Sequence, residues 1–98
     1  MAQQVFKITN ATDVKLISIG DGVSVIKSMT IANIHSADAT VDLYLKNAAG
    51  TIYYILKSLV LPTGVTLKMD SNEVSFDNRL YDLYINLGGS TPVDVIIN

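Results

Sequence analysis

Residues 40–67 read TVDLYLKNAAGTIYYILKSLVLPTGVTL, and this stretch decides the fold. Apolar and polar side chains alternate with a period of two from Val41 to Lys46, which is the pattern of a strand with one buried and one solvated face. The next four residues end in Gly50, and glycine at the fourth position is typical of a tight turn. An apolar run follows at once. The stretch therefore predicts two antiparallel strands joined by a hairpin.

The second strand of this hairpin, residues 51–61, has apolar side chains at both even and odd positions. Strict alternation would place Tyr53 and Ile55 on one face of the strand and Tyr54 and Val60 on the other. Both faces are therefore expected to be buried. We expect one face to pack in the core of the domain and the other face to contact a neighbouring subunit.

The rest of the chain repeats the period-two pattern, and no segment has the spacing of an amphipathic helix. Turn residues recur every eight to twelve residues or so, a spacing typical of all-β sandwiches and barrels. We predict an all-β fold: a single antiparallel β-sandwich of jelly-roll or immunoglobulin-like type, spanning residues 1–98 as one domain, with about eight to nine short strands and no significant helix. The expected strands are residues 5–9, 14–19, 23–34, 40–47, 51–61, 65–70, 73–77, 80–87 and 93–97.

The composition contains more apolar residues than a domain of this size can bury. The chain has 98 residues, of which 49% are hydrophobic and 16% are charged. An average soluble domain has about 25% charged residues. Because a small domain has a small interior, part of the apolar surplus should lie on the surface as a contact patch. The sequence therefore predicts a protein that binds other proteins and forms a homo-oligomer.

The charge distribution gives no support for binding nucleic acid or a membrane. Seven basic and nine acidic residues leave a net charge of −2, and the basic residues are spread singly along the chain. The longest uninterrupted apolar run, residues 52–56, is far shorter than the ~20 residues that span a bilayer. The first ten residues lack the basic start and apolar core of a secretory signal, so synthesis in the cytoplasm is expected.

The residues that could carry catalysis or hold a metal are few and badly spaced. His35, Ser36 and Asp38 fall in one short turn, where they cannot adopt the geometry of a catalytic triad. The acidic residues between Asp70 and Asp77 do not match the calcium-loop pattern. The sequence contains no cysteine. We therefore predict no catalytic residue, no cofactor, no metal site and no enzymatic activity.

The tyrosines leave two interpretations open. Aromatic rings can stack on sugars, which would suit a carbohydrate-binding or receptor-binding module. Tyrosine is also favoured in protein interfaces, where an apolar ring is buried and the hydroxyl stays near water. Core packing or a protein interface is the interpretation that we favour for these residues. They are Tyr44, Tyr53, Tyr54, Tyr81 and Tyr84.

Several short motifs follow one another through the last two thirds of the chain. They are Ile31-Ala32-Asn33, the strand from Thr40 to Leu45, the Tyr53-Tyr54 pair, Leu61-Pro62-Thr63-Gly64 with Leu67, and Val93-Asp94-Val95-Ile96-Ile97. In this combination they resemble small all-β virion structural proteins of tailed bacteriophages, especially phages of marine and cyanobacterial hosts. The motifs consist of turns and core positions. The resemblance therefore implies a fold and a setting, and the first 25 residues lie outside it.

The resemblance implies a structural role in the virion. The first expectation is a capsid decoration, or cement, protein that stabilises the shell through protein–protein contacts. A neck, tail or fibre accessory protein is the alternative within the virion, and a carbohydrate-binding or receptor-binding β-sandwich module is the alternative from another class. The expected partners are the major capsid protein or other virion proteins and further copies of the chain, with a trimer as the first expectation. The expected location is the virion.

Two strands are expected to supply the contact surface. The hairpin strand at residues 51–61 has apolar side chains on both faces, and the N-terminal strand begins with three apolar residues among its first four positions. The candidate interface residues are Val5, Phe6, Ile8, Tyr53, Ile55, Leu59 and Tyr84.

Overall fold

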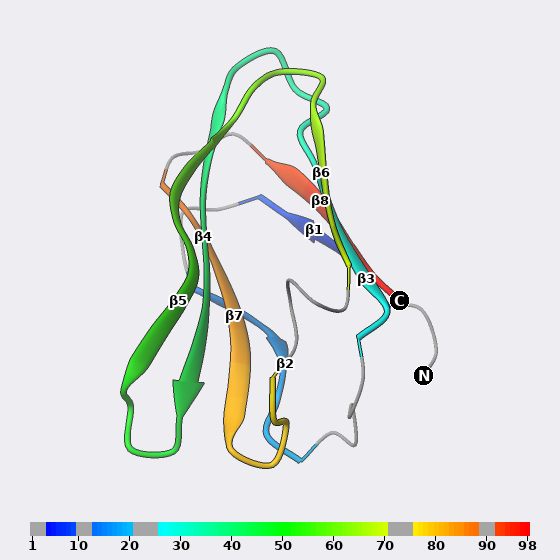
Figure 1. Ribbon diagram of the computed structural model, residues 1–98. Helices are drawn as coiled ribbons and strands as arrows, with labels where there is room; N and C mark the ends of the chain where they lie inside the picture. Colours follow the sequence, from blue (N-terminus) through cyan, green and yellow to red (C-terminus); the bar gives the residue numbers. More distant parts are fainter. Residues whose placement is uncertain (1–3, 10–12, 21–25, 71–75, 89–91) are drawn as a thin grey trace.

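The computed structural model describes residues 4–9, 13–20, 26–70, 76–88 and 92–98. These residues form eight strands in two four-stranded sheets and contain no helix, so the predicted all-β sandwich is confirmed (Figure 1). The strands are β1 (Gln4–Ile8), β2 (Val14–Ile17), β3 (Ser28–Ala32), β4 (Ala39–Asn47), β5 (Ile52–Leu61), β6 (Thr66–Asp70), β7 (Tyr81–Leu87) and β8 (Val93–Ile97).

The strand order is that of a jelly roll. The first sheet has the order β1-β8-β3-β6 and the second has the order β2-β7-β4-β5, and every pair is antiparallel. Among the eight described strands, only β4 and β5 are neighbours both in sequence and in one sheet, because every other connection crosses between the sheets. In an immunoglobulin fold the first two strands pair with each other, whereas β1 and β2 lie in different sheets here. The order therefore decides between the two sandwich types that the sequence left open.

The core lies between the two sheets and is built from alternate residues of each strand. Residues that lie opposite each other on neighbouring strands point to the same side of the sheet. Met29 lies opposite both Met69 and Ile97, so these three inward side chains of the first sheet come together. In the second sheet, Leu43 and Ile85 are matched in the same way. The largest side chains with essentially no exposure are Ile17, Met29, Ile31, Val41, Leu43, Leu83, Ile85, Leu87, Val93, Val95 and Ile97.

The two sheets differ in length. β4 has nine residues and β5 has ten, whereas β1, β3, β6 and β8 have five each. At about 3.3 Å per residue, β5 is roughly twice as long as the strands of the opposite sheet. The hairpin end of β4 and β5 and the start of β7 therefore extend beyond the first sheet, at the bottom of Figure 1.

The β4–β5 hairpin forms as the sequence predicts. Gly50 has a φ of +89° and donates its N–H to the carbonyl oxygen of Asn47 at 3.0 Å. The Asn47 side-chain oxygen also accepts the N–H groups of Ala49 and Thr51. The spacing of Pro62 and Gly64 would also suit a hairpin turn, but this turn connects β5 with β6, which lie in different sheets.

Buried Asn33 ties two turns together at the end of the sandwich opposite the hairpin. Its side-chain N–H groups donate to the carbonyl oxygens of Ala37 (2.8 Å) and Leu61 (2.9 Å), and its side-chain oxygen accepts the N–H of His35 at 3.0 Å. Its backbone N–H donates to Val65 at 3.1 Å. The strand predicted over residues 23–34 therefore ends earlier, at Ala32, because the side chain of Asn33 forms hydrogen bonds with these turns and the regular pairing between strands stops there. Residues 23–25 lie outside the described residues.

Asn78 has the corresponding role at the hairpin end. Its side chain donates to the carbonyl oxygen of Ser18 at 2.8 Å, and its own carbonyl oxygen accepts the N–H of Gly20 at 3.0 Å. The turn before β7 is thereby fixed to the end of β2. The seventh predicted strand, residues 73–77, falls mostly outside the described residues, and its last two positions, Phe76 and Asp77, are not in a strand.

Candidate functional site

Three tyrosines form a row across the outer face of the second sheet. Tyr84 of β7, Tyr44 of β4 and Tyr54 of β5 occupy matched positions of neighbouring strands. The Tyr44 and Tyr84 rings are parallel, with centroids 5.3 Å apart, and the Tyr44 and Tyr54 rings are tilted at 5.6 Å. Aromatic pairs at these separations stabilise a sheet beyond the apolar area that they bury.

Lysine side chains cover the ends of this tyrosine row. The ammonium groups of Lys15 and Lys46 lie 5.7 and 5.5 Å from the centroid of Tyr84, and that of Lys57 lies 4.7 Å from the centroid of Tyr54. Such cation–π contacts place positive charge over the Tyr84 and Tyr54 rings, where a sugar would have to stack. Tyr54 is still half exposed, so this end of the row stays accessible.

Asp13 and Tyr44 are linked beside this row. Tyr44 is nearly fully buried, and its hydroxyl is hydrogen-bonded to the Asp13 carboxylate, which also accepts an N–H of Asn86 at 2.6 Å. Burial raises the pKa of Tyr44 well above its ordinary value, and the hydrogen bond to Asp13 raises it further. Tyr44 is thus held as a neutral donor over the whole physiological range and serves the structure of the face.

Asp42 fixes an irregular point in β5. One of its carboxylate oxygens accepts the N–H of Ser58 at 2.6 Å, and the other lies 3.3 Å from the Lys57 ammonium. The hydrogen bond with Asp42 raises the pKa of Lys57. Ser58 has a φ of 54°, so the chain bulges there.

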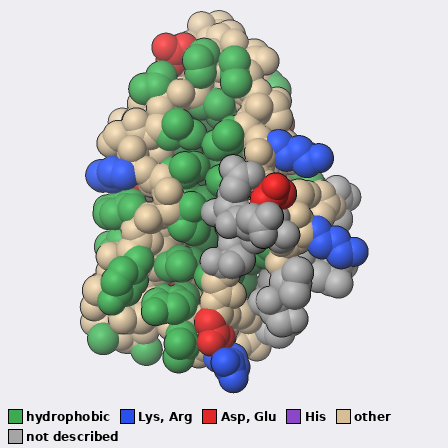
Figure 2. Space-filling view, viewed as in Figure 1, with side chains coloured by type: hydrophobic (Ala, Val, Ile, Leu, Met, Phe, Trp, Pro, Cys, Tyr) green, Lys and Arg blue, Asp and Glu red, His purple; other side chains and the backbone are tan. Residues whose placement is uncertain are grey.

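Exposed apolar side chains gather at the hairpin end of the second sheet. Ile52, Tyr53 and Tyr54 of β5, with Leu80 just before β7, are between 41 and 55% exposed. Asn47 of β4 is matched with Tyr81, and the Tyr81 ring lies edge-on to Tyr53 at 6.0 Å, so the two segments adjoin. We call Ile52, Tyr53, Tyr54 and Leu80 the hairpin-end patch. Figure 2 shows hydrophobic side chains gathered at this end of the molecule and along the β5 side.

A second group of exposed apolar side chains lies at the opposite end of the hairpin. Ile34, Val60 and Val65 are between 42 and 62% exposed, and they flank the turns that Asn33 holds. We call Ile34, Val60 and Val65 the turn-end patch. Together the two patches contain seven of the nine large apolar side chains that are exposed in the described part of the chain; the other two are Val5 and Ile19.

The structure separates the candidate interface residues of the N-terminal strand. Alternation along β1 turns Val5 outward, where it is 69% exposed, and turns Phe6 and Ile8 inward. Ile8 is buried in the core, and Phe6 packs against it. The expectation that Phe6 and Ile8 form a contact surface is therefore corrected, because they are needed inside the sandwich. Val5 remains available for contact.

The candidates on β5 are divided in the same way. Leu59 is matched with Val41, and Ile55 packs against the core, so both face the opposite sheet. Tyr53, in contrast, lies where the second sheet extends beyond the first and is half exposed. Within the single chain, β5 is an edge strand with exposed residues on its outer face, so the contact of its second face with a neighbouring subunit stays a prediction.

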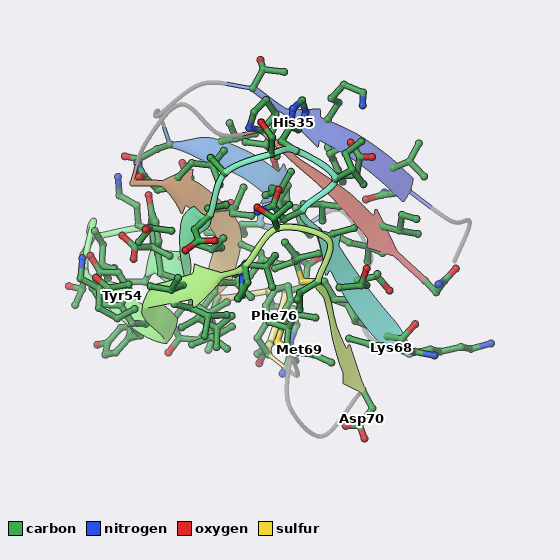
Figure 3. All side chains as sticks on the ribbon, turned by 90° about the horizontal axis from the view of Figure 1, so that it is seen from above. His35, Tyr54, Lys68, Met69, Asp70 and Phe76 are labelled. Atoms are coloured by element: carbon green, nitrogen blue, oxygen red, sulfur yellow. The ribbon has the colours of Figure 1, made fainter. Side chains whose placement is uncertain are left out.

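Tyr84, the remaining candidate, is partly buried in the tyrosine row beneath Lys15 and Lys46. Figure 3 shows the two faces of the second sheet: Tyr54 lies on its outer side, whereas Met69 and Phe76 lie between the sheets.

Sequence reasoning did not identify Ile34, Val65 or Leu80. A single large apolar residue between Asn33 and His35 was the available signal for Ile34.

The groups considered for chemistry lie apart from one another. His35, Ser36 and Asp38 are all exposed in the loop between β3 and β4. Asp77 pairs with Arg79 at 3.0 Å, and the hydrogen bonds from Arg79 lower the pKa of Asp77. Among the described residues, no three His, Asp or Glu side chains gather as a metal site would require. The same residues include no helix with the length and hydropathy needed to cross a membrane.

No protein-family model and no curated protein matches this chain. Among solved structures, the chain is similar to a de novo designed double-stranded β-helix, with 11% identity and a TM-score of 0.41 over 100% of this chain and 97% of the other. It is also similar to the Anabaena sensory rhodopsin transducer, with 12% identity and a TM-score of 0.45 over 100% and 96% of the two chains. A third similarity, to a chain of infectious bursal disease virus strain Gx, has 11% identity and a TM-score of 0.41 over 99% of this chain and 33% of that one. The jelly-roll assignment depends on the chain's own strand order.

Proposed function

We propose that this protein is a structural component of a tailed-phage virion, acting as a capsid decoration protein that joins neighbouring subunits of the shell. The observation that carries the proposal is the position of the two apolar patches at opposite ends of the β4–β5 hairpin. A body with a contact surface at each end can bridge two neighbours. The resemblance of its motifs to small all-β phage virion proteins supports the same role.

The size of the two patches limits the strength of each contact that such a protein could make. Full burial of a large apolar side chain contributes about 1.5–3 kcal/mol, so three or four half-exposed side chains contribute roughly 3–5 kcal/mol per patch. Association subtracts at least about 4 kcal/mol from that gain. One patch alone therefore gives a weak contact. Many copies on an ordered shell, each held at both ends, would gain strength from the repetition.

The outer face of the second sheet gives less support to the carbohydrate-binding alternative. Lysine ammonium groups lie over the Tyr84 and Tyr54 rings, so a sugar that stacked there would have to displace them. A neck, tail or fibre accessory remains the second candidate within the virion. It differs from a decoration protein mainly in the number of copies per particle.

Quantitative mass spectrometry of particles purified from the source culture tests the proposal. A decoration protein should be present in hundreds of copies per particle, whereas six to a few dozen copies would assign it to the neck, tail or fibre. Absence from particles would overturn the virion role, and glycan-array binding by the same preparation would then favour the carbohydrate-binding alternative.

A pair of variants tests the contact surface itself. Ile34→Asp places a charge in the turn-end patch and should reduce loading onto particles at least tenfold. Ser36→Asp changes an exposed position of the same loop and should load normally. Equal loading of both variants would contradict the assignment of this end to the shell.

A further inference from the structure

The four edge strands of the sandwich differ in how they are protected against pairing. Edge strands of soluble proteins commonly carry a charged residue that prevents another strand from adding to the sheet. Three edges follow this rule, with Lys7 in β1, Lys15 in β2 and Lys68 in β6. The fourth edge strand, β5, carries no charge over its first five residues and reaches Lys57 only after them.

Beyond Tyr54 the edge of β5 is interrupted. The pairing with β4 shifts twice, once at Ile55 and once at Lys57 and Ser58. The Asp42 carboxylate accepts the Ser58 N–H, which holds the second bulge in place. Bulges of this kind twist an edge away from a would-be partner. The regular and uncharged part of the edge is therefore the segment Ile52–Tyr54, next to the hairpin turn.

We propose that this segment pairs with the same segment of a second copy of the chain, antiparallel and about a two-fold axis at Tyr53. Such an axis places Tyr53 opposite Tyr53 of the second copy, and Ile52 opposite Tyr54 of the second copy. Ile52 and Tyr54 both lie on the outer face, since they are matched with Lys46 and Tyr44, so the facing residues share a face. The inference rests on the proposed function in treating the hairpin-end patch as a contact surface.

The charges near the segment permit this pairing. In the same register Lys57 falls opposite Ala49 of the second copy, so no like charges oppose each other along the segment. Every facing pair within the segment is aromatic or aliphatic, which is the combination that stabilises antiparallel neighbours. The second sheets of the two copies would then form one continuous eight-stranded sheet. The contact is two-fold, so it gives a dimer in place of the trimer that was expected from the sequence.

The contact is small, so the dimer should be weak. Ile52, Tyr53 and Tyr54 are each between 41 and 50% exposed. Side chains of this size have surfaces of about 200–250 Å², so the three contribute roughly 300 Å² per copy and ~600 Å² per pair. Stable interfaces bury at least about 1,200 Å² in total. We therefore expect only weak dimer formation by the free chain, with the shell raising the local concentration.

Sedimentation velocity of the purified full chain over a concentration series tests the pairing. The wild-type chain should shift from monomer to dimer, and both Tyr53→Lys and Tyr53→Glu should weaken dimer formation at least tenfold. An equimolar mixture of these two variants should restore it, because residue 53 faces its own counterpart. Thr66→Lys, an exposed position on the edge strand β6 of the other sheet and outside both apolar patches, is the matched control and should behave as the wild type. A monomer at all concentrations, or a mixture without restored dimer, would overturn the proposal.

A disulfide test does not depend on added charge. The chain contains no cysteine, so Tyr53→Cys and Thr66→Cys, at an exposed position of the edge strand β6, each introduce a single thiol. Tyr53→Cys should form a covalent dimer at least ten times faster than Thr66→Cys at equal concentration, and equal rates would overturn the pairing. Both tests use the pure chain. Their failure would leave the particle-loading results for Ile34→Asp unaffected, so the two proposals can fail separately.

Discussion

Replacing Asn33 should reduce the stability of the protein more than replacing any residue near it in the loop. Asn33→Ala removes two donors, to Ala37 and to Leu61, and one acceptor, for the N–H of His35. The Asn33 side chain is only 1% exposed, so water cannot replace these partners without entering the sandwich. At about 1 kcal/mol for each hydrogen bond, the free energy of unfolding should fall by about 3 kcal/mol.

Thermal and urea unfolding followed by circular dichroism would measure this change. For a domain of this size, 1 kcal/mol corresponds to about 4–8 °C in Tm, so we expect a decrease of roughly 12–24 °C. Asn33→Asp should be at least as harmful, since it keeps the acceptor but loses both donors and buries a charge. His35→Ala is the matched control, because only the backbone N–H of His35 takes part. A loss below about 0.5 kcal/mol for Asn33→Ala would refute the assignment of Asn33 as the link between the two turns.

Three further substitutions test other parts of the account. Tyr44→Phe should cost about 1 kcal/mol at neutral pH through the lost hydrogen bond to Asp13. Because folding raises the pKa of Tyr44, the neutral tyrosine contributes fully to the free energy of unfolding below pH 10, its ordinary pKa, and contributes less as the pH rises above that value. The free energy of unfolding in urea should therefore fall more steeply from pH 7 to 10.5 for the wild type than for Tyr44→Phe. Equal slopes for the two proteins would contradict the role of burial. Asp42→Ala should cost about 1–2 kcal/mol and speed hydrogen exchange of the Ser58 amide, whereas an unchanged exchange rate would show that the bulge holds without the carboxylate. Gly64→Ala should cost about 1–2 kcal/mol through backbone strain alone, since φ is +77° and the added methyl group would meet no atom within 4 Å; an unchanged midpoint of urea unfolding would exclude that strain.

Local sequence patterns carry most of the information about the strands. Period-two alternation and glycine turns place all eight observed strands, because both signals depend on residues close together in the chain. The errors have equally local causes. The run of β-branched residues after position 23 suggested a long strand, but the side chain of Asn33 takes up the polar groups of two turns and ends β3 at Ala32.

The arrangement of the strands and the faces of β5 could not be predicted in this way. Which strands lie at the edges depends on pairings between distant segments, so the edge position of β5 is invisible in residues 51–61 alone. The two bulges then shift the alternation, so Leu56 and Leu59 both face the core although three positions separate them. Ile55 and Leu59 were assigned to a contact surface for a different reason: alternation places them with Tyr53 on one of two apolar faces, and residues 51–61 do not show which face is the inner one. Tyr53 lies on that inner face too, and it is exposed because the second sheet extends beyond the first at the hairpin end.

Backbone hydrogen exchange of the chain bound to purified particles, compared with the free chain, tests the central claim most directly. The claim is that the two apolar patches hold neighbouring proteins. It predicts that amides around Ile34 and Val65 and along residues 51–54 exchange at least tenfold more slowly in the bound state, while those of β7 beneath the lysines change little. Unchanged exchange at both ends of a bound chain would contradict it.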